Sequence, residues 1–347
     1  MEHDTDRSPP VETRRSRSAA HAAAARERAV EPRSDWAMTG LTVVMVGLIL
    51  LRSRITSVIE DQEALAAWLT VFVSIGLQSL PFLVLGTVLS AAVSVLVPPG
   101  AIQRMLPRSP GLGVPVAAVS GIVLPVAEGT SVPIAGSLVS RGVKPAVAVT
   151  FLLAAPAVNP VVLVSTAVAF AGHLEMVGAR LAASVLTAVV VGWIWVGLGR
   201  DPVPRVAPRG VGGGGRVADV VAVARHDLLR AGGLLVLGAA VAASVNVLAP
   251  SSVVDTLSED LLLSVLLLAA FAVVVAVCSE ADAFVAASLS QFPPLAQLVF
   301  MVVGPVVDVK LVARQAGAFG RAFTSLLAPL TFVVAVTCAL AVGVAVL

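Results

Sequence analysis

The chain has 347 residues, of which 58% are hydrophobic and only 13% are charged. The charged share is about half that of an ordinary soluble domain, so the composition excludes a protein folded mainly in water. The formal net charge of +2 gives no reason to expect a nucleic-acid partner. We therefore expect the lipid bilayer to be the main solvent of this chain.

The first 36 residues differ in kind from the rest of the chain. They hold seven arginines among Ser, Pro, Glu and Ala. Such a segment cannot bury enough apolar surface to fold alone, and we predict a disordered cytoplasmic tail over residues 1–36. The alternative is a short basic helix over residues 19–28 that rests on anionic lipid.

Long runs with almost no charge follow the tail. They cover residues 37–51, 66–97, 111–139, 146–172, 178–199, 231–249, 261–279, 293–307 and 322–347. Several reach the roughly 20 residues that a helix needs to cross a hydrocarbon core of about 30 Å. Because the runs are continuously apolar rather than alternating, they exclude an outer-membrane barrel. The sequence predicts an all-α fold, a polytopic transmembrane helical bundle.

A segment rich in Pro, Gly and Arg, residues 200–230, interrupts these runs. Short basic loops stay on the cytoplasmic side, so we predict a cytoplasmic linker here. It separates a first transmembrane half, residues 37–199, from a second, residues 231–347. The acidic loop at 250–260 has no basic residue and is expected on the outer side.

The two halves share a faint internal repeat. In the first half Glu128 is followed by Phe151, Pro156 and Asn159, and in the second Glu280 is followed by Phe300, Pro305 and Asp308. The spacings from Phe to Pro and from Pro to Asn or Asp are the same in both copies. We predict two repeats with broken or re-entrant helices, inverted with respect to each other, with hairpins at 111–139 and 262–291. This arrangement gives seven full crossings.

Several residues are expected to break helices inside the membrane. They are Pro125, Gly129, Pro133, Pro156, Pro160 and Pro305. A break leaves backbone carbonyls without helical partners. At membrane depth this is tolerated only where the backbone lines a cavity or lies inside protein. The breaks therefore point to the place where a solute binds.

Ionisable and polar residues within apolar runs are the candidates for binding a substrate or ion. A carboxylate at the membrane centre costs roughly 2.5 to 3.5 kcal/mol even on the mildest scale, so its presence needs a reason. The candidates are Glu128, Asn159, Glu280, Asp282 and Asp308. Glu280 and Asp282 are close in sequence, and their mutual repulsion and desolvation favour retention of a proton, as in a proton relay.

Structural readings of the same residues stay open. Glu128 could be neutralised by a neighbour at a hairpin tip. Asn159 could bond only to the kinked backbone, and Asp308 with Lys310 could form an ion pair at the membrane interface. The two cysteines, Cys278 and Cys338, are interpreted as small buried hydrophobic residues.

Other chemistry lacks a motif. The cysteines form neither a disulfide framework nor a metal-binding pattern, so we expect no metal. The glycine run at 212–215 is not followed by the Lys and Ser or Thr of a phosphate-binding loop, and no cofactor is expected. No catalytic motif is present, so an intramembrane enzyme is disfavoured.

The sequence resembles the predicted permease family of unknown function that includes the organoarsenical efflux permeases. The resemblance covers roughly residues 66–325 and rests on Leu124-Pro125 and on the segments 133–142, 151–160, 278–284 and 304–311. It implies a multi-spanning transporter of the bacterial cytoplasmic membrane. Many relatives carry two cysteines where this chain has Ala127, Glu128, Gly129 and Thr130. Because trivalent arsenicals want thiolate ligands, this departure argues against an arsenical substrate.

These observations favour a secondary permease that moves an unidentified small solute or ion, coupled to protons, as a monomer or homo-oligomer. The alternative is a non-transporting membrane subunit or scaffold of a larger complex. It predicts that the buried carboxylates can be changed to amides without effect.

Overall fold

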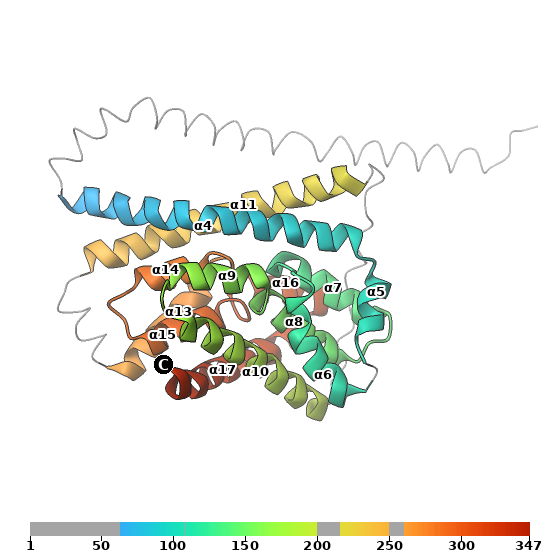
Figure 1. The fold of residues 1–347 in the computed structure, drawn as a ribbon. Helices are drawn as coiled ribbons and strands as arrows, with labels where there is room; N and C mark the ends of the chain where they lie inside the picture. Colours follow the sequence, from blue (N-terminus) through green and yellow to red (C-terminus); the bar gives the residue numbers. More distant parts are fainter. Residues whose placement is uncertain (1–62, 108, 200–215, 250–259) are drawn as a thin grey trace, which may run out of the picture. The chain divides into compact units, whose positions relative to one another are not determined.

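The computed structural model describes residues 63–107, 109–199, 216–249 and 260–347 (Figure 1). The predicted tail, the apolar run 37–51 and nearly all of the acidic loop lie outside these residues. The contacts divide the chain into two units, 1–66 and 67–347, and the fold presented below is that of the second. All regular elements in the described residues are helices, which confirms the predicted all-α fold.

Five apolar segments of the described residues are long enough to cross a membrane. They are α4 (Glu63–Leu96), α8 with α9 (Pro145–Ala169), α10 (Leu174–Leu198), α11 (Arg216–Leu248) and α17 (Arg321–Val346). Large apolar side chains such as Leu77, Val236 and Val333 are exposed on their surfaces. An exposed apolar belt of this kind suits contact with lipid and confirms a polytopic helical bundle.

The start of the second half differs from the prediction. Helix α11 begins at Arg216, so residues 216–230, predicted to belong to the linker, are helical. The reason is local, because Pro and Gly are absent between Gly215 and Gly232 and the basic residues there suit the solvated end of a long helix. Helix α11 therefore includes the last part of the predicted linker, while the place where the chain enters the membrane remains a prediction.

Two helices are interrupted where the sequence predicted hairpins. Helix α6 (Pro110–Val119) and the short 3₁₀ helix η1 (Ser120–Ile122) end before a break, after which α7 (Glu128–Ser140) begins. Helix α13 (Leu261–Val275) ends before a second break, followed by α14 (Asp282–Ser288). We call residues 123–127 the first break and residues 276–281 the second break. Their re-entrant placement in a membrane remains a prediction.

Not every predicted helix breaker acts as one. Pro125 lies in the first break, but Gly129 lies in the first turn of α7, and α7 continues through Pro133. A proline near the start of a helix removes only one hydrogen bond, here to the carbonyl of Gly129, so the helix survives. Pro156 lies in the last turn of α8, and Pro160 begins α9.

Each break is followed by the same order of helices. After α7 come α8 (Pro145–Ala157), α9 (Pro160–Ala169) and α10, and after α14 come α15 (Pro294–Val303), α16 (Val309–Phe319) and α17. Asn159 caps the start of α9 and Asp308 caps the start of α16, each with its side-chain oxygen. This order is consistent with a repeat, while the superposition of the halves and their inversion remain predictions.

The crossing predicted over residues 293–307 does not form as one helix. Helix α15 ends at Val303, and Pro305 lies in the turn before α16. Ten residues are fewer than the roughly 20 that a crossing needs. The helix is instead buried along most of its length, like α8.

The core is formed by α8 and α15, each surrounded by helices of its own half. Helix α8 packs against α6, α7 and α10, and α15 packs against α13, α14 and α17. The halves join mainly where α10 packs along α17, with Trp195 edge-on to Phe323. Helix α5 (Pro99–Met105) is a short connection between α4 and α6. This packing brings Glu128, the first residue of α7, to Ser279 in the second break.

Candidate functional site

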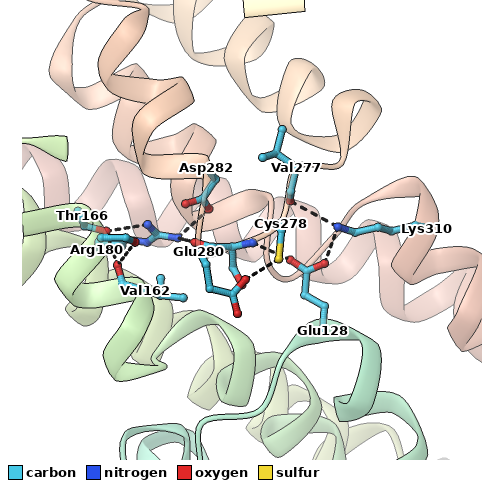
Figure 2. Close-up of polar contacts among 11 residues, drawn as sticks. Glu128, Val162, Thr166, Arg180, Val277, Cys278, Glu280, Asp282 and Lys310 are labelled. Carbon is cyan, nitrogen blue, oxygen red and sulfur yellow. Dashed lines mark hydrogen bonds and ion pairs between the residues drawn. The ribbon is translucent and has the colours of Figure 1, made fainter. Parts of the chain in front are cut away.

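Four of the five predicted site residues meet around the second break. Three of them, Glu128, Glu280 and Asp282, are labelled in Figure 2. Glu128, Glu280, Asp282 and Asp308 are each exposed by 3% or less. They come from α7, the second break, α14 and the residue before α16. Because isolated carboxylates cannot be buried cheaply, their partners determine what this site can do.

Glu128 connects the two halves. It is the first residue of α7, and its Oε2 lies 2.7 Å from Lys310 Nζ. Its Oε1 accepts a hydrogen bond of 3.2 Å from the backbone N–H of Ser279 in the second break. A carboxylate at a helix N-terminus is also favoured by the helix dipole. Glu128 therefore contacts a basic side chain and a backbone donor and lies at the start of its own helix.

Lys310 has more oxygen neighbours than a simple ion pair requires. Besides Glu128, its Nζ lies 3.4 Å from Asp308 Oδ2. It also donates to the backbone carbonyls of Ala276 at 2.9 Å and Val277 at 3.5 Å. Lys310 was predicted only as an interfacial partner of Asp308. The structure gives it a central place between both halves.

Asp282 is paired with a basic residue that the sequence analysis missed. Arg180 of α10 is fully buried, and its Nη2 lies 2.7 Å from Asp282 Oδ2. The same guanidinium donates to Thr166 Oγ1 at 2.7 Å and to the carbonyl of Ser279 at 3.4 Å. The signal was available, because Arg180 is the only Arg or Lys between Lys144 and Arg200. A charged side chain within an apolar run is costly and needs a reason, and this holds for an arginine as well as for a carboxylate.

Glu280 differs from the other three carboxylates. Its Oε2 accepts hydrogen bonds from the thiol of Cys278 and, at 3.3 Å, from the hydroxyl of Ser279. Its Oε1 has no hydrogen-bond partner, and no basic side chain of the described residues forms an ion pair with it. Cys278 is buried, as predicted, but it is also a donor to this carboxylate.

Asn159 does not join the cluster. Its Oδ1 accepts from the backbone N–H of Val161 and so caps α9, which is the structural reading left open above. Its Nδ2 is buried and has no hydrogen-bond partner. Asn159 and Asp308 thus share a capping role, but only Asp308 reaches the ionised groups.

Helix α4 covers the unpartnered oxygen of Glu280. A Cβ atom at Gly86 would lie only 2.6 Å from Glu280 Cγ and 2.8 Å from Oε1, so this carboxylate rests directly on the backbone of α4. One turn later, Ser90 Oγ accepts from the N–H of Ala127 in the first break. One turn earlier, Phe82 packs against Phe284 of α14. One face of α4 therefore contacts both interrupted segments.

We expect Gly86→Ala to destabilise the protein, because the added methyl group overlaps a fully buried carboxylate and real Cβ atoms do not approach so closely. A loss of about 1 to 3 kcal/mol, seen as a lower melting temperature in detergent, is typical of overpacking. Gly76→Ala on the same helix is the matched control, since its Cβ would meet nothing within 4 Å. Equal melting temperatures for the two variants would contradict this expectation, because they would show that α4 and Glu280 can move apart at Gly86 without a loss of stability.

The cluster carries more negative than positive charge. It holds four carboxylates but only two basic side chains, Arg180 and Lys310. Arg314 and Asp227 lie nearby, beside Gly129, and bring one charge of each sign. The described residues contain no group of three His, Cys, Asp or Glu side chains arranged to hold a metal ion. Protons or a cationic solute can balance the excess charge.

Comparison with known proteins agrees with this membrane architecture. A family model described as "Predicted permease" matches residues 64–344. The chain belongs to this permease family. The match includes both breaks, all four carboxylates and both basic residues of the cluster. The family supports a transporter rather than an enzyme and establishes a multi-pass membrane permease.

Two curated relatives of the permease cover most of its length. It is 29% identical over 278 residues to "UPF0718 protein YcgR" of Bacillus subtilis, which is 78% of this chain and 94% of that protein. It is 28% identical over 264 residues to the "Putative two-component membrane permease complex subunit" of Streptococcus mutans, which is 74% of this chain and 88% of that protein. No solved structure matches the permease.

Proposed function

We propose that this permease is a secondary transporter of the bacterial cytoplasmic membrane, which moves a small solute or ion in exchange or symport with protons. Glu280 is the group that takes up and releases the proton. The observation that carries the proposal is the environment of Glu280 among the described residues. The carboxylate is fully buried, accepts from two neutral donors, forms no ion pair with these residues and has one oxygen without a hydrogen bond to them. Burial opposes the charged form of such a group.

The other carboxylates are less suited to carry the proton. Glu128 is held by Lys310, and Asp282 is held by Arg180, each at 2.7 Å. An adjacent cation favours the charged carboxylate and opposes protonation. Asp308 is fixed by the N–H of Leu311 at 2.6 Å and shares Lys310 with Glu128. In this proposal these groups shape and hold the site, while Glu280 carries the proton.

The interrupted helices support binding at the same place. The second break offers backbone groups without helical partners between the end of α13 and the start of α14. Such half-helix ends are a common way to build a solute or ion site within a membrane protein. In this proposal the predicted tail 1–36 and the predicted linker 200–230 lie on the cytoplasmic side.

A second candidate function is that of one subunit in a two-part permease. The printed name of the Streptococcus mutans relative describes such a subunit. In this case the chain would need a partner protein before any solute crosses the membrane. The ionised cluster would then bind solute only in the assembled complex.

The test is transport by the purified chain alone. Reconstituted in proteoliposomes and offered a panel of small ions and metabolites, it is expected to move at least one of them faster under a pH gradient than without it. Solute flux and internal pH would be followed together, since coupled transport collapses the gradient. Flux that ignores the gradient would refute proton coupling. Flux that appears only after a partner protein is added would support the second candidate.

A further inference from the structure

We propose that the ammonium group of Lys310 is a tethered cation, which occupies a monovalent-cation site formed by the end of α13, the start of α7 and the cap of α16. The proposal rests on the proposed function and sharpens it. Because Lys310 then fills one cation position permanently, the proton at Glu280 is the positive charge that the permease exchanges.

The neighbours of the ammonium group form a cation-binding set of oxygens. They are Glu128 Oε2 at 2.7 Å, Ala276 O at 2.9 Å, Asp308 Oδ2 at 3.4 Å and Val277 O at 3.5 Å from Lys310 Nζ. Carboxylate and backbone carbonyl oxygens are the ligands that hard cations prefer. The two shorter distances, 2.7 and 2.9 Å, are normal for N–H···O hydrogen bonds and exceed the about 2.0 to 2.6 Å of Mg²⁺ and Ca²⁺. They suit a monovalent ion of the size of ammonium, with the two more distant oxygens in its surroundings.

The backbone is shaped for this arrangement. Ala276 ends helix α13 with φ of 52° and ψ of 44°, a left-handed conformation that L residues other than Asn and Asp rarely adopt. Strained backbone of this kind persists where the surrounding structure requires it. Here it ends the helix so that the carbonyls of Ala276 and Val277 accept from Lys310. The C-terminal end of a helix also favours a positive charge.

The anionic side chains are fixed independently of Lys310. Glu128 Oε1 accepts from the backbone N–H of Ser279, and Asp308 Oδ1 accepts from that of Leu311. The Asp308 Oδ2 atom is buried and has no hydrogen-bond partner, only the nearby charge of Lys310. If the ammonium group were removed, two carboxylates and two carbonyls would still face one space. An external cation of the right size should then bind there.

The experiment is the salt dependence of stability in Lys310→Ala. The full-length variant is purified in detergent, and its melting temperature is measured at equal ionic strength in choline, sodium, potassium and ammonium chloride. We expect the lowest value in choline, which is too large to enter. Ammonium or potassium should raise the melting temperature by at least about 2 °C, the size expected when a ligand binds only the folded state.

Matched variants separate a bound cation from a general salt effect. The wild type and Lys144→Ala, which changes an exposed lysine, should melt alike in all four salts. Lys310→Met combined with Glu128→Gln removes one charge of each sign, so its stability should not depend on the cation. If Lys310→Ala folds only when ammonium or potassium is present throughout purification, that result also supports the proposal.

The proposal is overturned if Lys310→Ala is equally stable, or equally unfolded, in choline and in the small cations. Because this measurement requires no transport, it is independent of proton coupling. A salt-dependent variant together with flux that ignores the pH gradient would reject the role of Glu280 and keep the tethered cation. If the stability of Lys310→Ala does not depend on the cation but flux does follow the pH gradient, only the tethered cation is rejected.

Discussion

Asp282→Asn is expected to lower the melting temperature of the purified permease by about 4 to 7 °C, the largest loss of stability among the single substitutions considered. The change leaves the guanidinium of Arg180 buried without its anion, and breaking a buried pair costs about 3 to 5 kcal/mol. Arg180 cannot avoid this cost by becoming neutral, because a guanidinium does not lose its proton in proteins. The measurement is thermal unfolding in detergent, with the folded yield as a second readout.

The opposite change should be milder. Arg180→Gln leaves Asp282 without a basic partner, but a carboxyl group can become neutral by taking up a proton. The double variant Arg180→Gln with Asp282→Asn replaces the ion pair by two neutral amides and should recover part of the stability. A double-mutant cycle measures this coupling directly. Additive losses in the double variant would mean that the two side chains do not stabilise each other.

Much of the architecture followed from the amino-acid sequence because the membrane constrains it strongly. Continuous apolar runs must form helices, and the two interruptions around Pro125 and after Val275 fall within the predicted hairpins. The shared spacing placed Asn159 and Asp308 after kinks at equivalent positions, and the structure adds that both residues cap the helix that follows. The helix boundaries differ more from the prediction: α11 begins at Arg216, within the predicted linker, and α7 continues through Pro133. Helix propensity alone does not determine where a helix starts or ends.

The acidic residues of the site could be predicted from the sequence, but the basic residues that pair with them could not. A buried carboxylate is conspicuous in an apolar run, and Glu128, Glu280, Asp282 and Asp308 were found in this way. Their partners come from helices far away in sequence, and no spacing rule connects Arg180 with a residue 102 positions later. Asn159 was grouped with them because of its equivalent position in the repeat. In the structure the two residues occupy equivalent positions, but only Asp308 lies beside a charged group, Lys310.

The pairing changes what the two central glutamates are expected to do. If the two glutamates shared one role in proton coupling, Glu128→Gln and Glu280→Gln would both fold normally and both lose coupled transport. In the structure Glu128 is the closest anion of Lys310, so its amide variant should lose stability as well as activity. Glu280 forms no ion pair with a basic side chain of the described residues, so an amide in its place leaves none of those basic groups without its partner.

Glu280→Gln is therefore expected to abolish solute flux driven by a pH gradient while the protein inserts, folds and melts like the wild type. The amide has nearly the size of the acid and imitates its protonated form, which cannot release a proton. Exchange of labelled solute without a gradient should persist, because binding and reorientation need no change of charge at residue 280. Glu63→Gln, which changes an exposed carboxylate at the start of α4, should alter none of these properties. Full gradient-driven flux in Glu280→Gln would remove Glu280 as the proton carrier, whereas loss of exchange together with driven flux would make it a ligand of the solute instead.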